Sequence, residues 1–271
     1  MSGSSAATAT VTEPADVGGA EPLLRLSQIK KHFGGVVALA DVSMDLDAGS
    51  VRGLIGPNGA GKTTLFDIVS GVTSASGGSV RFGGTDITRV SPTGRARLGI
   101  RRTFQRAQVF NWLSVEDNVL AALEWRGGGG GVLADLTALR TRRVLERARR
   151  ERAAEVLAWC GLEPVRTDAA GSLPLGLQRV VELARAIVDR PRLLLLDEPT
   201  SGLDQAESAR FGDLIVSLRG EGCAVLLVEH DAEFVMRLCD RICVLNLGAV
   251  LVEGTPAEVR ADQAVRDAYL G

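Results

Sequence analysis

Short apolar runs separated by helical and turn segments dominate the hydropathy pattern of this chain. Strand-like alternation begins at Leu24 and is clearest over residues 42–47, where every second residue is apolar. A short apolar run at 51–55 predicts a strand that leads into a Gly-rich loop, and two later apolar runs, at 193–196 and 223–228, are typical of parallel strands buried on both faces.

A helix predicted over residues 205–219 lies between the last two of these runs. Strand, helix and strand at this spacing predict a parallel sheet covered by helices on both faces. A second helix is predicted over 62–70, directly after the run at 51–55. The pair Gly77-Gly78 marks a turn before a further strand at 79–82. The pattern therefore predicts an α/β core.

The middle of the chain has a different pattern. Residues 114–160 are helical in period but are interrupted by five consecutive glycines at 127–131, which predict a flexible loop. Seven arginines follow within 140–152, with only two glutamates among them. We interpret them as the solvated face of a helix with Glu–Arg pairs, the alternative being a face toward anionic lipid or an acidic partner. We expect a helical insertion at roughly 100–175.

Composition narrows the class of protein. The chain of 271 residues is 45% apolar and 24% charged, enough for one large core, and its net charge of −2 argues against a general nucleic-acid binder. No apolar run is long enough to span a bilayer, and residues 1–22 predict a disordered tail rather than a secretory signal. The four cysteines form no CxxC pair, so we expect reduced thiols and a cytoplasmic location.

Residues 56–64 read GPNGAGKTT and match the phosphate-binding pattern G-x-x-x-x-G-K-[ST]. The glycines let successive backbone N–H groups face an anion, and the following helix adds its positive end. Lys62 is a point charge for the β- and γ-phosphates, and the Thr63 hydroxyl can ligate Mg²⁺. The predicted nucleoside triphosphate site consists of Gly56, Pro57, Asn58, Gly59, Ala60, Gly61, Lys62, Thr63 and Thr64.

Two later strands end in polar pairs. The run at 193–196 leads into Asp197 and Glu198, and the run ending at Val228 leads into Glu229 and His230. Carboxyl ends of parallel strands meet at one edge of a sheet, where ligands of open α/β folds bind. Asp197 could hold the metal and Glu198 could polarise a water at the γ-phosphate. Taken singly, helix-capping acids and a helix-start histidine are the alternatives.

With these residues in place, the chain from Leu24 to Gly271 resembles the ATP-binding-cassette (ABC) family. LLLLDEPTSGLD at 193–204 resembles the second nucleotide motif followed by the dimer-contacting loop that ends at Asp204. VEHD at 228–231 resembles the region of the switch histidine, His230. RTFQ at 102–105 resembles the loop whose Gln105 lies near the metal and the attacking water. Phe33 stands where the family stacks an aromatic ring on adenine, the alternative being a core phenylalanine.

The resemblance narrows to the ATP-binding subunits of branched-chain amino-acid importers and their amide or urea relatives. The segment that ends in AYLG is the most telling, since generic cassettes do not share it. The segments that carry this resemblance are GTDIT at 84–88, GIRRTFQ at 99–105, LSVEDNV at 113–119, CDRICVLNLG at 239–248 and EGTPAEVRADQAVRDAYLG at 253–271.

The resemblance implies one cassette over residues 23–271, with a RecA-like P-loop NTPase core, an antiparallel β subdomain and the helical subdomain at 100–175. It implies an ATPase that uses ATP and Mg²⁺, with Thr63, Gln105 and Asp197 at the metal and Lys62, Gln105, Glu198 and His230 in catalysis. Expected partners are two permease subunits, a second cassette in a homo- or heterodimer and, indirectly, a solute-binding protein, at the cytoplasmic membrane face.

The alternatives are a soluble cassette ATPase acting on nucleic acid or the ribosome, and a nucleotide-binding regulator with weak turnover. The chain has neither the long coiled-coil insertion nor the second cassette of those soluble classes.

One motif departs from the family. Where the signature LSGGQ is expected, residues 173–177 read LPLGL. Pro174 lacks the serine hydroxyl and Leu177 replaces the glutamine, while Gly176 and the start of a helix remain, so backbone N–H groups can still face a phosphate. We expect a half-site that is weakened but active.

Overall fold

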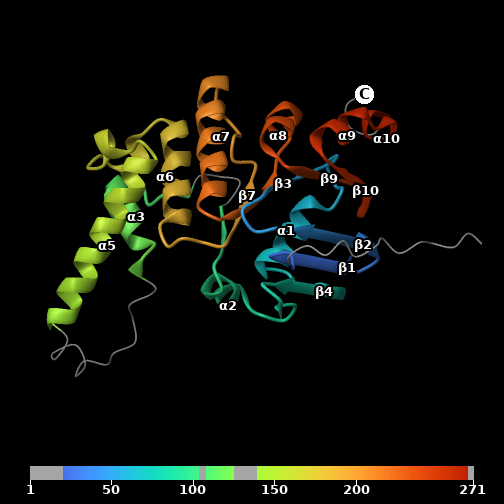
Figure 1. Ribbon diagram of the computed structural model, residues 1–271, viewed down its shortest axis with the longest axis horizontal. Coiled ribbons are helices and arrows are strands. Elements are labelled where there is room, and N and C mark those ends of the chain that lie inside the picture. Colours follow the sequence, from blue (N-terminus) through green and yellow to red (C-terminus); the bar gives the residue numbers. More distant parts are fainter. Residues whose placement is uncertain (1–20, 104–107, 125–138, 268–271) are drawn as a thin grey trace, which may run out of the picture.

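The computed structural model of the chain describes residues 21–103, 108–124 and 139–267 (Figure 1). Within these ranges the strands form one ten-stranded sheet in the order β5-β4-β1-β2-β10-β9-β3-β8-β7-β6. The strands are β1 (Leu24–Phe33), β2 (Val36–Leu46), β3 (Val51–Ile55), β4 (Gly77–Phe82), β5 (Thr85–Asp86), β6 (Ile100–Arg102), β7 (Leu193–Asp197), β8 (Ala224–Val228), β9 (Arg241–Asn246) and β10 (Ala249–Gly254).

Helices flank this sheet along its length (Figure 1). They are α1 (Lys62–Ser70), α2 (Pro92–Arg97), α3 (Val115–Ala121), α5 (Leu139–Trp159), α6 (Leu175–Ile187), α7 (Gln205–Gly220), α8 (Ala232–Leu238), α9 (Pro256–Ala261) and α10 (Gln263–Val265), with single 3₁₀ turns η2 (Glu163–Val165) and η3 (Ala170–Ser172).

The parallel half of the sheet explains the continuous apolar runs. β3 pairs in parallel with β8 and β9, β7 pairs with β8, and every residue of β3, β7 and β8 is buried. Successive side chains alternate between two apolar clusters: Leu193 and Leu195 pack on the side of α1, and Leu194 and Leu196 on the side of α6 and α7. The predicted α/β fold with a parallel core is confirmed.

The N-terminal strands form an antiparallel unit beside this core. β1 pairs with both β2 and β4, and β4 pairs with β5. β2 joins the core through one parallel pair, Asp41 with Ala249 on β10. Its apolar face packs on α1, so the helix that follows the phosphate-binding loop is held between the two parts of the sheet.

The predicted helical insertion begins later than residue 100. Residues 100–102 form β6, which pairs in parallel with β7 and belongs to the sheet. Between residues 108 and 187 the described chain contains helices and 3₁₀ turns, together with one isolated bridge between Ser114 and Ala169. The division into subdomains otherwise stays a prediction. The expected tail up to residue 20 and the glycine run at 127–131 lie outside the described residues.

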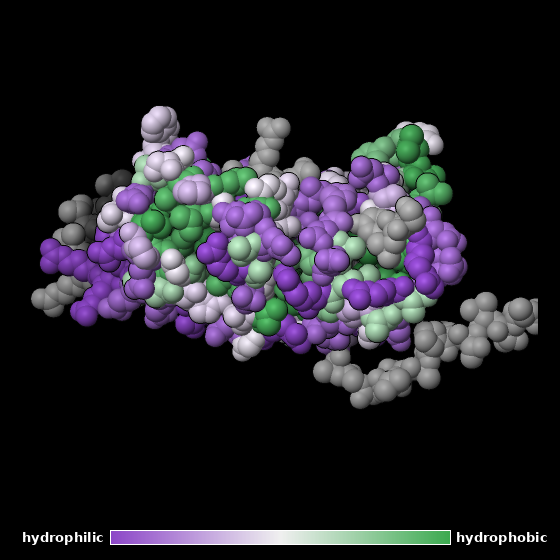
Figure 2. Space-filling view, turned by 90° about the horizontal axis from the view of Figure 1, so that it is seen from above, coloured by the Kyte–Doolittle hydropathy of each residue, from purple (hydrophilic) through white to green (hydrophobic). Residues whose placement is uncertain are grey.

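The Arg-rich sequence lies on α5, at the strongly hydrophilic end of the molecule (Figure 2). Arg147 pairs with Glu151 at 2.8 Å and Arg150 with Glu146 at 2.9 Å, both at i,i+4 spacing and exposed. These pairs are the ones that a solvated helix face predicts, and each contributes only about 0.3–0.5 kcal/mol. No helix in the described ranges is both long and apolar enough to cross a membrane.

All four cysteines are free thiols. Cys223, Cys239 and Cys243 are buried and Cys160 is half-buried. Burial raises the pKa of each to about 12, so the thiols are neutral near pH 7.

Arg95 on α2 ties the end of α1 to the chain that follows β5. It is 2% exposed, and burial lowers its pKa. Its guanidinium donates hydrogen bonds to the carbonyl oxygens of Ile68, Val69, Ile87, Thr88 and Val90.

We expect Arg95→Met to lower the free energy of unfolding by about 3 kcal/mol, because it leaves several buried carbonyls without a donor. Urea denaturation measures this loss. Arg97→Met on the exposed face of the same helix is the matched control and should cost less than about 0.5 kcal/mol. Equal losses in the two variants would show that Arg95 does not hold the end of α1.

Candidate nucleotide-binding and hydrolysis site

The phosphate-binding loop joins the end of β3 to the start of α1, and its backbone path requires glycine at two positions. At Gly56, with φ of 148°, a Cβ atom would lie 2.1 Å from the Leu245 carbonyl oxygen. At Gly61, with φ of 103°, a Cβ atom would lie 2.7 Å from the Ala38 carbonyl oxygen. The loop is therefore pressed against β9 and β2 at these two glycines.

Lys62 is held inside this loop. Its ammonium group donates to the carbonyl oxygens of Gly56 at 2.6 Å and Pro57 at 3.0 Å, and the residue is 7% exposed. Burial lowers the pKa of Lys62, while the negative charges of Glu198 and Asp197 oppose that shift. The lysine thus lies between the loop and the two carboxylates, and the next residue, Thr63, is exposed.

The carboxyl ends of β7 and β8 bring the two polar pairs together, as the sequence predicts. Nε2 of His230 lies 2.7 Å from Oε1 of Glu198, 32 residues away in the sequence. The Glu198 side chain is 18% exposed and that of His230 is 45% exposed, so both can reach a ligand. Glu198 has a left-handed backbone with φ of 47°, which is costly for a residue with a side chain and is often found at functional sites.

Glu229 supports the loop that follows Glu198, a role that the sequence did not reveal. It is 4% exposed, and its Oε1 accepts hydrogen bonds from the amide of Thr200 at 2.8 Å and from the Thr200 hydroxyl at 2.6 Å. Its Oε2 accepts from the amide of His230 at 3.1 Å. Both loops at this sheet edge are therefore fixed by one buried carboxylate, and its position after a buried strand was the only signal.

Arg102 is a further residue that the sequence analysis did not single out, although it begins the RTFQ segment. Its Nη2 donates to Oδ2 of Asp197 at 3.0 Å, and its Nη1 donates to Asp67 and to the hydroxyl of Ser70. Burial raises the pKa of Asp197, and the bond from Arg102 opposes the rise. The strand that leads to Gln105 is thereby linked to the second nucleotide motif.

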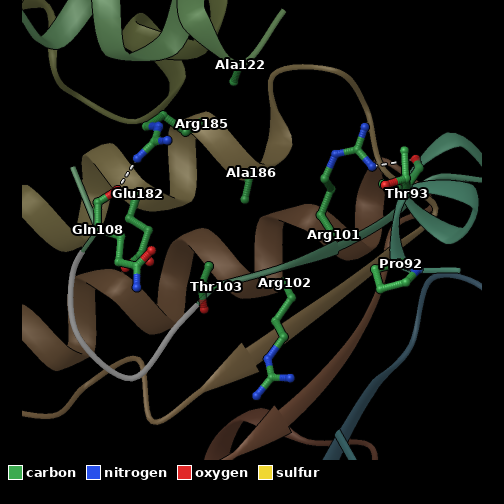
Figure 3. Close-up of a pocket in the computed structure, with 11 residues that line it drawn as sticks. Pro92, Thr93, Arg101, Arg102, Thr103, Gln108, Ala122, Glu182, Arg185 and Ala186 are labelled. Carbon is green, nitrogen blue, oxygen red and sulfur yellow. Dashed lines mark hydrogen bonds between the residues drawn. The ribbon is translucent and has the colours of Figure 1, made fainter. Parts of the chain in front are cut away.

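Gln105 itself lies in 104–107, outside the described residues. The residues on either side of this segment, Thr103 and Gln108, line a cavity of about 520 Å³ between α2, β6 and α6 (Figure 3). Arg185 points toward Gln108 and donates to its carbonyl oxygen, and Arg102 points away from both, toward the sheet (Figure 3).

The signature segment lies where α6 begins. Pro174 is the residue before the helix, and Gly176 in its first turn is buried against α7, because a Cβ atom there would lie 2.3 Å from Oε1 of Glu207. Leu177 is partly buried and packs against the main apolar cluster. Leu175, by contrast, is 43% exposed. The segment thus keeps a helix start with a buried glycine, and the side chain at position 177 is apolar and half-buried.

Asp204 and Phe33 are both accessible. Asp204 caps α7: it accepts from the amide of Glu207 at 2.8 Å, and the Glu207 carboxylate accepts from the Asp204 amide. Phe33 is 52% exposed, and the Lys31 ammonium lies 4.7 Å from its ring centre. A buried core role for Phe33 is therefore excluded, and its ring is open to stacking.

Magnesium has suitable oxygen donors at this edge. Nucleotide enzymes hold Mg²⁺ through one or two carboxylates together with substrate phosphates, rather than through an all-protein cage. Asp197 and Thr63 are such donors, and the described residues contain no group of three or more potential metal ligands. Arg102 donates to Oδ2 of Asp197, and Oδ1 is not part of that hydrogen bond.

Known proteins are similar to this chain in sequence and in fold. The family model described as "ABC transporter" matches residues 39–201, and one described as "Branched-chain amino acid ATP-binding cassette transporter" matches residues 249–271. The high-affinity branched-chain amino acid transport ATP-binding protein BraF of Pseudomonas aeruginosa is 39% identical over 92% of this chain and 98% of its own length. The lipopolysaccharide export system ATP-binding protein LptB of Escherichia coli is 34% identical over 92% and 97%.

A solved ATP-binding cassette of an ABC transporter in its ADP conformation superposes with a TM-score of 0.80 at 29% identity, covering 93% of this chain and all of that one. The family match covers more than half of the sequence. The chain therefore belongs to the ABC transporter family, as an ATP-binding subunit that hydrolyses ATP.

Proposed function

We propose that this chain powers the uptake of branched-chain amino acids, or of a related amino acid or amide, from the cytoplasmic face of a membrane. The contact between Glu198 and His230, beside the phosphate-binding loop and Lys62, carries the hydrolytic part of this proposal. The substrate class is supported by the match of residues 249–271 and by the greater similarity to BraF than to the export protein LptB.

Each residue of the site has a distinct role in the proposed reaction. Lys62 and the loop amides bind the β- and γ-phosphates, and the exposed ring of Phe33 stacks on adenine. Glu198 orients a water and accepts its proton as the water attacks the γ-phosphorus in line, and the bond to the β-bridging oxygen breaks to give ADP and phosphate.

His230 holds the Glu198 carboxylate in place and is close enough to stabilise charge on the transferring phosphoryl group. Thr63 and Asp197, with Gln105, would hold Mg²⁺, which neutralises charge on the phosphate oxygens when it is bound.

The proposed transporter contains two cassettes. Each would hold ATP between its own phosphate-binding loop and the partner's signature segment at 173–177, with Asp204 near the contact. Because ATP binds the closed pair more tightly than the open pair, binding and hydrolysis shift the population between the two states. Two membrane permease subunits would follow this motion through the helical insertion, while a solute-binding protein supplies substrate from the other side.

We expect Glu198→Gln to bind ATP with unchanged affinity and to lose at least about 100-fold in turnover, because the amide cannot accept the proton. Steady-state phosphate release and nucleotide binding measure the two quantities. Glu233→Gln, an equivalent change at an exposed position on α8, is the control and should leave both unchanged. Undiminished turnover by the Glu198 variant would remove this residue from the role of base.

We expect Leu177→Gln to raise turnover in a purified homodimer, because it restores a side-chain donor beside the partner's phosphate. Since Leu177 packs against the apolar cluster, the same change should also lower the free energy of unfolding. Hydrolysis is therefore compared at temperatures where both proteins are folded. Turnover equal to that of the natural sequence would show that LPLGL does not weaken the site.

The proposed assembly is tested by purifying the tagged chain from gently solubilised native membranes. We expect two polytopic permease subunits and a cassette partner to copurify, and the solute-binding protein of the same system to identify the substrate. Recovery with ribosomes or nucleic acid would favour the soluble ATPase alternative. Recovery alone, without turnover, would favour the regulatory one.

A further inference from the structure

A second cavity lies at the opposite edge of the sheet from the nucleotide site. Its volume is about 330 Å³, within the range of small-molecule sites, and it is bounded by α5, the end of α6, the end of α7 and the start of β8. Its walls combine apolar and aromatic groups. Among the lining residues, Val156, Ile187, Leu218 and Cys223 are each no more than 5% exposed, and Trp159 is half-buried.

The rim of this cavity carries charged side chains of both signs. Arg152 and Arg190 line it together with Glu155 and Glu221, and Arg192 also lines it, although its guanidinium is stacked 5.0 Å from the ring centre of Phe82. Two nitrogens of the Arg152 guanidinium already have partners. Its Nε donates to the Val188 carbonyl oxygen at 2.9 Å, and its Nη1 pairs with Glu155 at 3.0 Å. An apolar pocket with arginines at its mouth suits a ligand with an anionic head and an apolar body.

Arg190 has the feature that is hardest to explain by folding alone. Its backbone is left-handed, with φ of 56°, in the turn after α6, where glycine or asparagine is usual. Its side chain is exposed at the cavity, and within the described part of the chain it has no carboxylate within 4 Å. The chain thus keeps a guanidinium here at a cost in backbone conformation.

The elements that meet at this cavity also build the ATP site. α6 begins at the signature segment, α7 begins after Asp204, and β7 ends at Asp197. At the opposite end of each element, the cavity is lined by Ile187 of α6, by Leu218 of α7 and by the residues that precede β7. A molecule bound between α5 and α7 would therefore change the positions of the signature segment, the dimer-contacting loop and the metal carboxylate, because rigid elements connect them to the cavity.

We propose that this cavity, which we name the α5–α7 pocket, binds a small carboxylate with a branched or aromatic apolar group and that its occupancy alters ATP turnover. Arg190 binds the carboxylate, and Val156, Trp159, Ile187 and Leu218 enclose the apolar group. Two sources share this chemistry. One is an amino acid with an apolar side chain, the class proposed above as cargo, and the other is the corresponding 2-oxo acid.

Isothermal titration of the full-length chain with L-leucine and with 4-methyl-2-oxopentanoate tests the binding step without using ATP. We expect saturable binding of at least one carboxylate and none of isopentylamine, which has the same apolar group without a carboxylate. The tighter ligand of the two identifies the source. Absence of saturable binding by both carboxylates, or equal binding of the amine, would overturn the proposal.

The variant Arg190→Gly tests whether the ligand binds in the α5–α7 pocket. Glycine adopts φ of 56° readily, so the variant should be at least as stable as the natural chain while its affinity falls about tenfold. Arg89→Gly removes the same charge from an exposed turn elsewhere and should leave binding unchanged. Equal affinity of the Arg190 variant and the natural chain would contradict the assigned position.

The coupling step rests on the proposed hydrolytic function and is measured separately. We expect a saturating concentration of the bound carboxylate to change steady-state ATP turnover at least twofold, and the concentration that gives half of this change to rise about tenfold in Arg190→Gly. Unchanged turnover at saturation would overturn the coupling. A chain that binds the carboxylate but hydrolyses no ATP would contradict the proposed function and leave the binding site standing.

Discussion

The register between β3, β8 and β7 determines where the reactive groups of this protein lie. The three strands are neighbours, all five residues of each are buried, and they pair in parallel, so their carboxyl ends fall on one edge. The phosphate-binding loop, Asp197 with Glu198, and Glu229 with His230 leave the sheet at that edge. A slip of one residue in β7 would turn Asp197 from one face to the other and separate it from Lys62.

Charges at this edge are balanced before any nucleotide arrives. Lys62 donates to the loop carbonyls, Asp197 is bonded to Arg102, and Glu198 contacts His230. A bare carboxylate or ammonium group in a half-buried position would carry a desolvation penalty, and these contacts offset it. A triphosphate therefore has to exchange partners with groups that are already paired, and the strand that carries Arg102 leads directly into the segment of Gln105.

Much of this arrangement could be predicted from the sequence, because it depends on local signals. The apolar runs and the phosphate-binding pattern predicted the bounds of β3, α1, β7 and β8 closely. The same motifs singled out Lys62 and Glu198 as candidate site residues. The missing part depends on pairing over long distances. Nothing in the local sequence IRR shows that residues 100–102 pair with β7. The helical insertion was therefore predicted to begin at about residue 100, before the sheet has ended. The partners of Arg102 and Glu229 likewise appear only when distant strands align.

The signature segment shows why a retained residue and a lost one carry different weight. Gly176 has an intramolecular reason to be glycine, since a side chain there would collide with Glu207 at the start of α7. Its presence would be required in any cassette with this approach of α6 to α7, whether or not the segment touches a phosphate. Leu177 packs into the apolar cluster, so its identity strengthens the fold at the expense of a polar side chain. The glycine at position 176 therefore does not distinguish a complete signature from a helix start with a purely structural role. The residue at position 177 does.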